Sequence, residues 1–221
     1  MTTHYFESGE SMKGNAKEAI VRASINLFNV NGFHGTSIRD IAKKAKVNPA
    51  NIAYYFENKH GLLEHCFTIF FERYVEEIEK GYGFLEQGAA ISLKKIAENI
   101  MLFQFENIHL TRLILREISL DTQIVREIMS TYLMKERFYI NKVIDQGIKG
   151  KEFHRSMPDY ITLQLKGLLS MPFLNTHYMN EVLHVRPNEL YFVEKYIREI
   201  YKWIDGVLCQ SEYERTYLAV N

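Results

Sequence analysis

Residues 32–63, GFHGTSIRDIAKKAKVNPANIAYYFENKHGLL, constrain this chain more than any other segment, because they predict two short helices joined by a tight turn. Thr36 precedes an apolar, helix-spaced run and is predicted to be the N-cap of a helix that ends near Ala45. Asn48 followed by Pro49 predicts the N-cap and first turn of a second helix. A longer helix is expected to start directly after the second one.

The second helix is expected to run through about Phe56 and to bury Ile52 and Phe56 on one face. Ala50, Asn51 and Tyr54 would then face away from the core. Such a face suits the major groove of DNA, because Asn can bond adenine bidentately, Ala can contact a thymine methyl group, and Tyr can reach a phosphate or a base. Two short helices and a turn also occur in other α-helical proteins, so this spacing alone leaves both readings open.

The charge distribution favours the DNA-binding reading. Residues 13–59 carry eight Lys or Arg and three acidic side chains, a net charge of +5 in a chain whose net charge is zero. A module that faces phosphates needs such an asymmetry.

At this point the segment resembles the DNA-binding domain of the TetR family. The shared motifs are Leu-Phe and then Gly-Phe at residues 27–28 and 32–33, and a Thr-Ser-hydrophobic-x-Asp-Ile-Ala run at residues 36–42. A Tyr-aromatic-Phe, a Lys and a Leu-Leu follow within residues 54–63. Three positions depart from the family's usual pattern, namely Lys46 in place of Gly, Ala53 in place of Tyr and Tyr55 in place of His. A non-glycine residue at position 46 would be strained if its φ is positive.

The resemblance implies specific roles on double-stranded DNA with a palindromic site. Thr36 and Ser37 would bond phosphates through side chain and helix N-terminus, residues 48–55 would form the recognition helix, and Lys59 would hold a phosphate. The candidate DNA-binding residues are Thr36, Ser37, Arg39, Asn48, Pro49, Ala50, Asn51, Tyr54, Tyr55 and Lys59.

The fold class expected is all-α, with a flexible extension at 1–12, a helix-turn-helix domain at 13–60 and a helical regulatory and dimerisation domain at 61–221. Few Pro and Gly residues interrupt long helical periodicities. By the TetR resemblance, the helices at 158–174 and 188–210 would form a homodimer's four-helix bundle.

An apolar seam on the last of these helices suits a partner helix, although the alternative is that it packs internally. The seam consists of Val193, Ile197, Ile200, Ile204 and Val207.

Between the helix-turn-helix and this pair, we expect a helix to about Lys80, two helices at 91–107 and 108–118 broken near Asn107, and a long helix at 121–150. Met and aromatic side chains could line a ligand pocket or belong to the core, and no polar set identifies a small-molecule effector. They are Phe103, Phe105, Met129, Met134, Phe138, Met171 and Phe173.

Enzyme chemistry is not expected, since the chain has no Gly-rich phosphate loop, no HExxH motif and no Cys cluster. We expect no metal and no cofactor. Cys66 and Cys209 lack metal-type spacing and are expected to be reduced. Without a membrane span or a signal segment, the protein is expected to be cytoplasmic and associated with the nucleoid.

Charged residues after position 110 form either a solvated helix surface or a patch for a protein partner, with Arg112, Arg116, Glu117 and Arg126 as candidates. Residues 54–65, 124–136 and 161–173 resemble RefZ-type proteins, a TetR-like group of spore-forming bacteria that bind DNA and restrain the division protein FtsZ. This resemblance implies regulation of cell division, with FtsZ as partner. The alternative is a ligand-responsive repressor of nearby genes.

Overall fold

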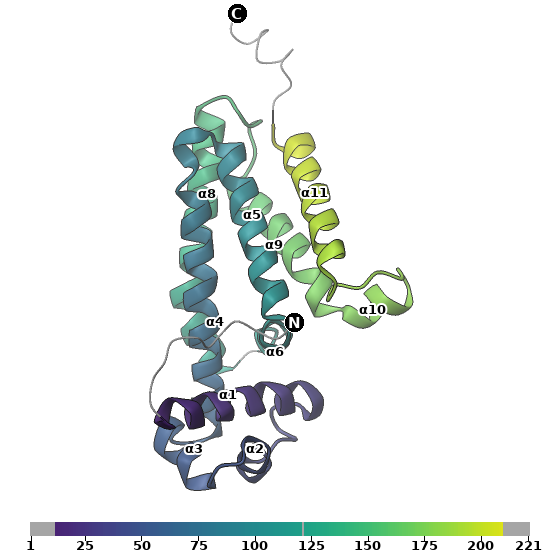
Figure 1. The fold of residues 1–221 in the computed structure, drawn as a ribbon. Coiled ribbons are helices and arrows are strands. Elements are labelled where there is room, and N and C mark those ends of the chain that lie inside the picture. The colour runs from purple at the N-terminus through teal and green to yellow at the C-terminus, as the bar shows by residue number, and fades with distance from the viewer. Residues whose placement is uncertain (1–11, 121, 210–221) are drawn as a thin grey trace, which may run out of the picture. The chain divides into compact units, whose positions relative to one another are not determined.

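The computed structural model describes residues 12–120 and 122–209, and the regular elements among them are helices (Figure 1). This confirms the predicted all-α class. The chain divides into two compact units: one holds residues up to Glu72 together with Glu106–Ile128, and the other holds Arg73–Phe105 and the residues from Met129 on. The predicted extension at 1–12 lies, apart from Met12, outside the described residues.

The first unit contains the predicted helix-turn-helix and two helices from later in the chain. Its elements are α1 (Met12–Asn31), α2 (Ile38–Ala45), α3 (Pro49–Phe56), the first part of α4 (Lys59–Tyr82), α6 (Ile108–Glu117) and α7 (Gln123–Ile128). Helix α1 packs against α2, α3 and α6. Phe28, Ile41, Ile52 and Phe67 are fully buried, so one apolar core supports the short helices.

The second unit is a bundle of longer helices. Besides the end of α4 it contains the 3₁₀ turn η1 (Leu85–Gln87), α5 (Ala89–Glu106), the π-helical turn η2 (Met129–Leu133), α8 (Met134–Lys149), α9 (Pro158–Leu174), α10 (Thr176–Glu181) and α11 (Leu190–Val207). The predicted break at Asn107 is confirmed. The single helix predicted at 121–150 is instead three successive elements, α7, η2 and α8. Residue 121, where that helix was expected to begin, lies outside the described residues. Helix α10 was not predicted.

A buried polar cluster joins three helices of this second unit. Glu136 on α8 accepts a hydrogen bond of 2.6 Å from the Tyr74 hydroxyl on α4, and it also pairs with Lys166 on α9. Burial and the neighbouring Glu136 carboxylate raise the pKa of Tyr74 well above its ordinary value. A buried charge is tolerated when it is paired in this way, so Glu136 links α4, α8 and α9 without a large desolvation cost.

The apolar seam of α11 packs inside its own chain. Val193, Ile197, Ile200 and Ile204 are buried, so the internal alternative is correct for these four residues, while Val207 is exposed. A second set of apolar side chains, on α9, is exposed in the single chain. They are Tyr160, Leu163, Met171 and Leu174.

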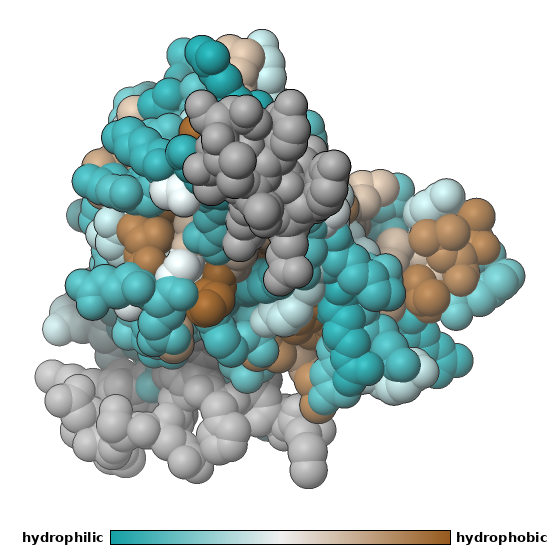
Figure 2. Space-filling view, turned by 90° about the horizontal axis from the view of Figure 1, so that it is seen from above, coloured by the Kyte–Doolittle hydropathy of each residue, from teal (hydrophilic) through white to brown (hydrophobic). Residues whose placement is uncertain are grey.

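Further apolar side chains lie exposed on and after α10, namely Tyr178, Val182 and Leu183. In the space-filling view the hydrophobic group at the far right corresponds to this element, which is also rightmost in Figure 1 (Figure 2).

The residues considered for a ligand pocket differ in exposure, and the side chain of one of them, Met129, lies outside the described part of the structure. Phe103 and Phe173 are buried, whereas Met134, Phe138 and Met171 are exposed, because α8 and α9 turn these three outward. In the described part of the chain, no group of His, Cys, Asp or Glu is arranged to hold a metal ion. No described helix is long and apolar enough to cross a membrane.

Candidate nucleic-acid interface

The N-terminus of α2 is closed by Ser37 and Asp40. Ser37 is the N-cap, which corrects the predicted cap at Thr36 by one residue. The Asp40 N–H donates to Ser37 Oγ at 3.1 Å, and the Ser37 N–H donates to Asp40 Oδ2 at 3.1 Å. The Ser37 hydroxyl also donates to Asp40 Oδ2 at 2.5 Å, and this bond, together with the Ser37 N–H, holds the pKa of Asp40 below its ordinary value. The N–H groups of the first two helical residues, Ile38 and Arg39, have no partner within a helix and can meet an anion from outside.

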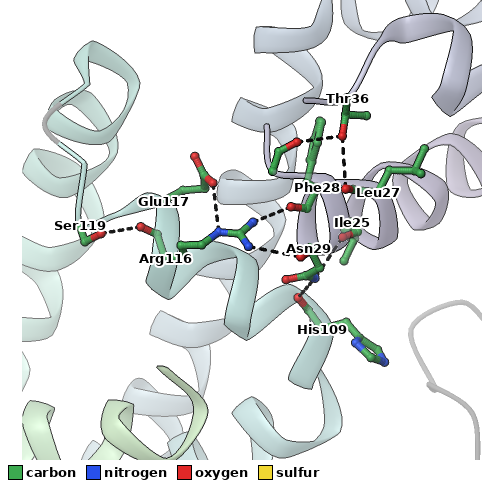
Figure 3. Close-up of polar contacts among 10 residues, drawn as sticks. Ile25, Leu27, Phe28, Asn29, Thr36, His109, Arg116, Glu117 and Ser119 are labelled. Carbon is green, nitrogen blue, oxygen red and sulfur yellow. Dashed lines mark hydrogen bonds and ion pairs between the residues drawn. The ribbon is translucent and has the colours of Figure 1, made fainter. Parts of the chain in front are cut away.

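Thr36 has a different role from the predicted one. Its side chain is only 1% exposed, and its hydroxyl contacts the carbonyl oxygens of Gly32 at 2.8 Å and Leu27 at 3.2 Å (Figure 3). A hydroxyl buried on two carbonyls does not face a phosphate. Thr36 therefore closes the turn between α1 and α2, and Ser37 is left as the exposed polar residue of the pair.

Helix α3 presents the face that the sequence predicts. Asn48 caps it by accepting a hydrogen bond of 2.9 Å from the Ala50 N–H, and Pro49 occupies the first helical position. Ile52 and Phe56 are buried, as expected from their spacing. Tyr54 is 75% exposed, and its ring contacts that of Tyr55 edge-on with 5.0 Å between centroids.

The remaining α3 candidates also lie at or near the surface. Ala50 is exposed and Asn51 and Tyr55 are partly exposed. An aromatic ring, an amide and a methyl group are thus available on one short helix, which suits recognition of base edges.

Basic side chains are exposed on α2, the helix that packs against α3. Arg39, Lys43, Lys44 and Lys46 are all exposed along α2 and the turn that follows it. Lys46 ends α2 in the left-handed conformation, with φ 57° and ψ 42°, and its N–H donates to the carbonyls of Ala42 and Lys43. Lys46 therefore has the positive φ that would strain a non-glycine residue at this position.

Lys59, the first residue of α4, is turned toward the protein. Its ammonium donates to the carbonyl oxygens of Phe33 at 2.9 Å and Thr36 at 2.8 Å, and it lies 4.5 Å from the centroid of the Phe33 ring. Three interactions with the turn between α1 and α2 make Lys59 an anchor of that turn. The predicted phosphate contact of Lys59 would have to compete with them.

Two of the four residues proposed for the partner patch, Arg116 and Glu117, make contacts within the protein. The Arg116 guanidinium donates to the Phe28 carbonyl at 2.6 Å and to the Asn29 carbonyl at 3.4 Å, and it pairs with Glu117 at 3.5 Å (Figure 3). Glu117 is buried. This corrects the surface assignment of Glu117, whereas Arg116 is partly exposed but bound to the end of α1, and Arg112 and Arg126 are exposed.

Asn29 adds a second link between the same helices. Its amide donates to the His109 carbonyl at 2.7 Å and to the Ile25 carbonyl at 3.0 Å (Figure 3). Together with Arg116 it attaches α6 to the C-terminal end of α1. A cation at this end of a helix is favoured by the helix dipole.

Sequence reasoning also missed Asn58, whose side-chain oxygen accepts from the N–H groups of His60 at 2.8 Å and Gly61 at 3.1 Å. An Asn just before the Lys-His-Gly start of a helix is an ordinary N-cap signal that could have identified it.

Comparison with known proteins agrees with this geometry. Residues 20–66 match the profile of "Bacterial regulatory proteins, tetR family". Over 197 residues the chain is 41% identical to the Bacillus subtilis protein named "Probable HTH-type transcriptional regulator YttP", a match that covers 89% of this chain and 95% of that relative. A shorter match of 46 residues at 44% identity covers 21% of this chain and 22% of the Escherichia coli HTH-type transcriptional regulator RutR.

Solved structures share the fold at low sequence identity. The ketosteroid transcriptional regulator KstR2 of Mycobacterium tuberculosis has a TM-score of 0.73 at 12% identity, with 92% of this chain and 98% of that chain covered. The TetR family regulator PfmR of Thermus thermophilus has a TM-score of 0.72 at 16% identity, with 85% and 97% covered. At these identities the likeness concerns the fold alone.

Proposed function

Because the chain belongs to the TetR family of bacterial regulatory proteins, we propose that it binds a palindromic DNA site as a homodimer and represses genes near that site. TetR regulators bind DNA as dimers and are not enzymes. The observation that carries the proposal is helix α3, which exposes Tyr54 beside the basic side chains of α2.

In the proposed complex, α3 lies in the major groove and the N-terminus of α2 meets the backbone. Ala50, Asn51 and Tyr54 read base edges, while Ser37 and Arg39 bind phosphates at the start of α2. The two copies of α3 in a dimer would lie about 34–36 Å apart, or more, to reach successive major grooves on one face of the duplex.

The second copy is proposed to pack on the exposed apolar face of α9. Tyr160, Leu163, Met171 and Leu174 recur at helical spacing along this face. Gly167 lies between them with no atom close to the position a Cβ would take. An exposed glycine inside a helix costs about 1 kcal/mol relative to alanine, so its presence suits a close crossing by another helix.

The first test is genome-wide occupancy of the tagged protein in its own cells, together with transcript levels after deletion of its gene. Occupied palindromes in a nearby promoter, with that transcript rising on deletion, are expected for a repressor. That result would motivate a search for a small-molecule effector. Absence of any enriched site would overturn the proposal.

A variant tests whether α3 reads the site. Tyr54→Ala is expected to weaken binding to the occupied palindrome while leaving thermal unfolding and dimerisation unchanged, because the side chain is 75% exposed. Tyr178→Ala, at an exposed tyrosine of α10, serves as the control. If the two variants bind equally well, Tyr54 is not part of the interface.

A second candidate function is regulation of cell division from chromosomal sites through FtsZ. It is favoured by the resemblance of residues 124–136 and 161–173 to RefZ-type proteins, although the names of the relatives above describe transcriptional regulators. Of the candidate partner residues, Arg112 and Arg126 are exposed. This function predicts occupied sites at set chromosomal positions with little change in transcripts, consistent with association with the nucleoid.

The partner surface can be tested separately from DNA binding. Charge reversal by Arg112→Glu and Arg126→Glu is expected to abolish an effect on division while DNA occupancy persists. Unchanged division would remove these two residues from the surface. Arg116→Glu is unsuitable for this purpose, because Arg116 binds the end of α1.

A further inference from the structure

The turn between α2 and α3 contains a lysine in an unfavourable conformation. Lys46 has φ 57° and ψ 42°, the left-handed region in which a Cβ crowds the backbone. Among the described residues, the other non-glycine positions with positive φ are Glu57, Lys151 and His184. Glycine would occupy position 46 without that strain, and glycine is what the TetR resemblance leads one to expect there.

The Lys46 side chain contributes nothing visible to the fold. It is exposed, and within the described part of the chain its ammonium has no acidic partner. The turn itself is closed by the backbone N–H of Lys46, which a glycine also has. Left-handed strain alone does not assign a role, since Lys151 shares it, so the surroundings of Lys46 have to indicate one.

The surroundings of Lys46 indicate what such a role would be. Lys43 and Lys44 are exposed on the last turn of α2, and Asn48 caps α3 two residues after Lys46. Residue 46 therefore lies between a basic helix end and the N-terminus of the proposed recognition helix. Both features attract an anion.

We propose that Lys46 binds a backbone phosphate of DNA beside the N-terminus of α3, and that the left-handed lysine is retained for this contact. The proposal rests on the DNA-binding function proposed above. It adds a phosphate contact that the family's usual glycine cannot make, so it strengthens binding to all sequences and does not select among bases.

The test uses two lysines with nearly the same backbone conformation. Lys46 has φ 57° and Lys151, which follows α8, has φ 56°. Lys46→Gly and Lys151→Gly are each expected to raise the unfolding temperature of the free protein by about 2–4 °C, since each removes left-handed strain. Only Lys46→Gly is expected to weaken binding to a short DNA duplex of mixed sequence, by several-fold at low salt.

The salt dependence identifies the contact as a phosphate. For Lys46→Gly, the slope of log K against log salt concentration is expected to be shallower than in the wild type by about 0.9, and Lys46→Arg is expected to restore it. An unchanged slope and affinity for Lys46→Gly, with the wild type binding normally, would overturn the Lys46 proposal alone. Failure of the wild type to bind any duplex would instead overturn the proposed function.

Discussion

Arg116 shows how one side chain can connect the two sequence regions of the first unit. Its guanidinium binds the carbonyls of Phe28 and Asn29, at the end of α1. Hydrogen bonds to charged groups contribute about 1.5–3 kcal/mol when they are protected from water, and the Arg116 side chain is 42% exposed. A contribution at the lower end of that range is therefore expected.

Arg116→Met is accordingly expected to lower the free energy of unfolding by about 1–2 kcal/mol, because it leaves two carbonyls at the end of α1 without their cation. Chemical denaturation measures the change, and Arg112→Met, at an exposed arginine of the same helix, is the control. Equal stability of the two variants would show that α6 does not hold α1 through this side chain.

His65 is a residue of the first unit from which a pH dependence of stability just below neutral pH is expected. Its ring lies 5.2 Å from that of Phe56, and burial lowers its pKa, with a further contribution from the charge of Lys17. The folded state thus favours the neutral ring, so the stability that His65 supports is complete above its ordinary pKa of 6.5. It is lost progressively as the pH falls below 6.5 toward the lower pKa of the folded state.

Stability measured by urea denaturation is therefore expected to fall between neutral pH and mildly acidic pH. His65→Gln is expected to reduce this dependence, whereas His34→Gln, at an exposed histidine, is expected to preserve it. Identical pH profiles for both variants would show that another group is responsible.

At the scale of helices, the sequence predicted the helix boundaries that depend on neighbouring residues. The cap at Asn48, the proline at position 49 and the break at Asn107 depend on residues next to the boundary, and the structure has all three. Thr36 and Ser37 are both good caps, and the choice between them follows from the contacts of Thr36 with Gly32 and Leu27 and from the pairing of Ser37 with Asp40.

Interactions between distant residues were beyond sequence reasoning. The exposed face of α3 follows from its spacing, but Lys59 contacts a carbonyl 26 residues away and Arg116 contacts one 88 residues away. No periodicity records such pairs. For the same reason the η2 turn and the internal packing of the α11 seam could not be read from the apolar pattern, which fits a partner helix equally well.

Glu152 illustrates such a distant interaction at the start of a helix. Its carboxylate accepts hydrogen bonds from the N–H groups of Ala89 at 2.7 Å and Ala90 at 2.8 Å, at the N-terminus of α5. Glu152→Ala is expected to cost about 1 kcal/mol in thermal or chemical denaturation, since it removes a charged cap. Glu86→Ala, at an exposed acid shortly before α5, should leave the stability unchanged. A similar loss in both variants would contradict the capping role.

At the scale of the whole molecule, the question is whether the apolar face of α9 or the apolar seam of α11 joins a second copy. The seam residues are already packed within the chain, so they are not free to join a second copy. The face formed by Tyr160, Leu163, Met171 and Leu174 is exposed and lies on a helix that the proposed dimer needs. We therefore expect dimerisation to depend on α9 more than on the predicted seam.

Leu163→Glu tests this expectation, because it places a charge at a leucine that is 68% exposed in the single chain. In the monomer the substitution should cost little, but in a dimer interface the buried, unpaired carboxylate should be strongly unfavourable. Sedimentation or light scattering over a range of concentrations is expected to show a shift from dimer to monomer. Affinity for a palindromic duplex should fall with it, since a monomer engages only one half-site. Val30→Glu, at an apolar residue of α1 that is 75% exposed, should remain dimeric. A dimeric Leu163→Glu variant with normal affinity would exclude this part of α9 from the interface.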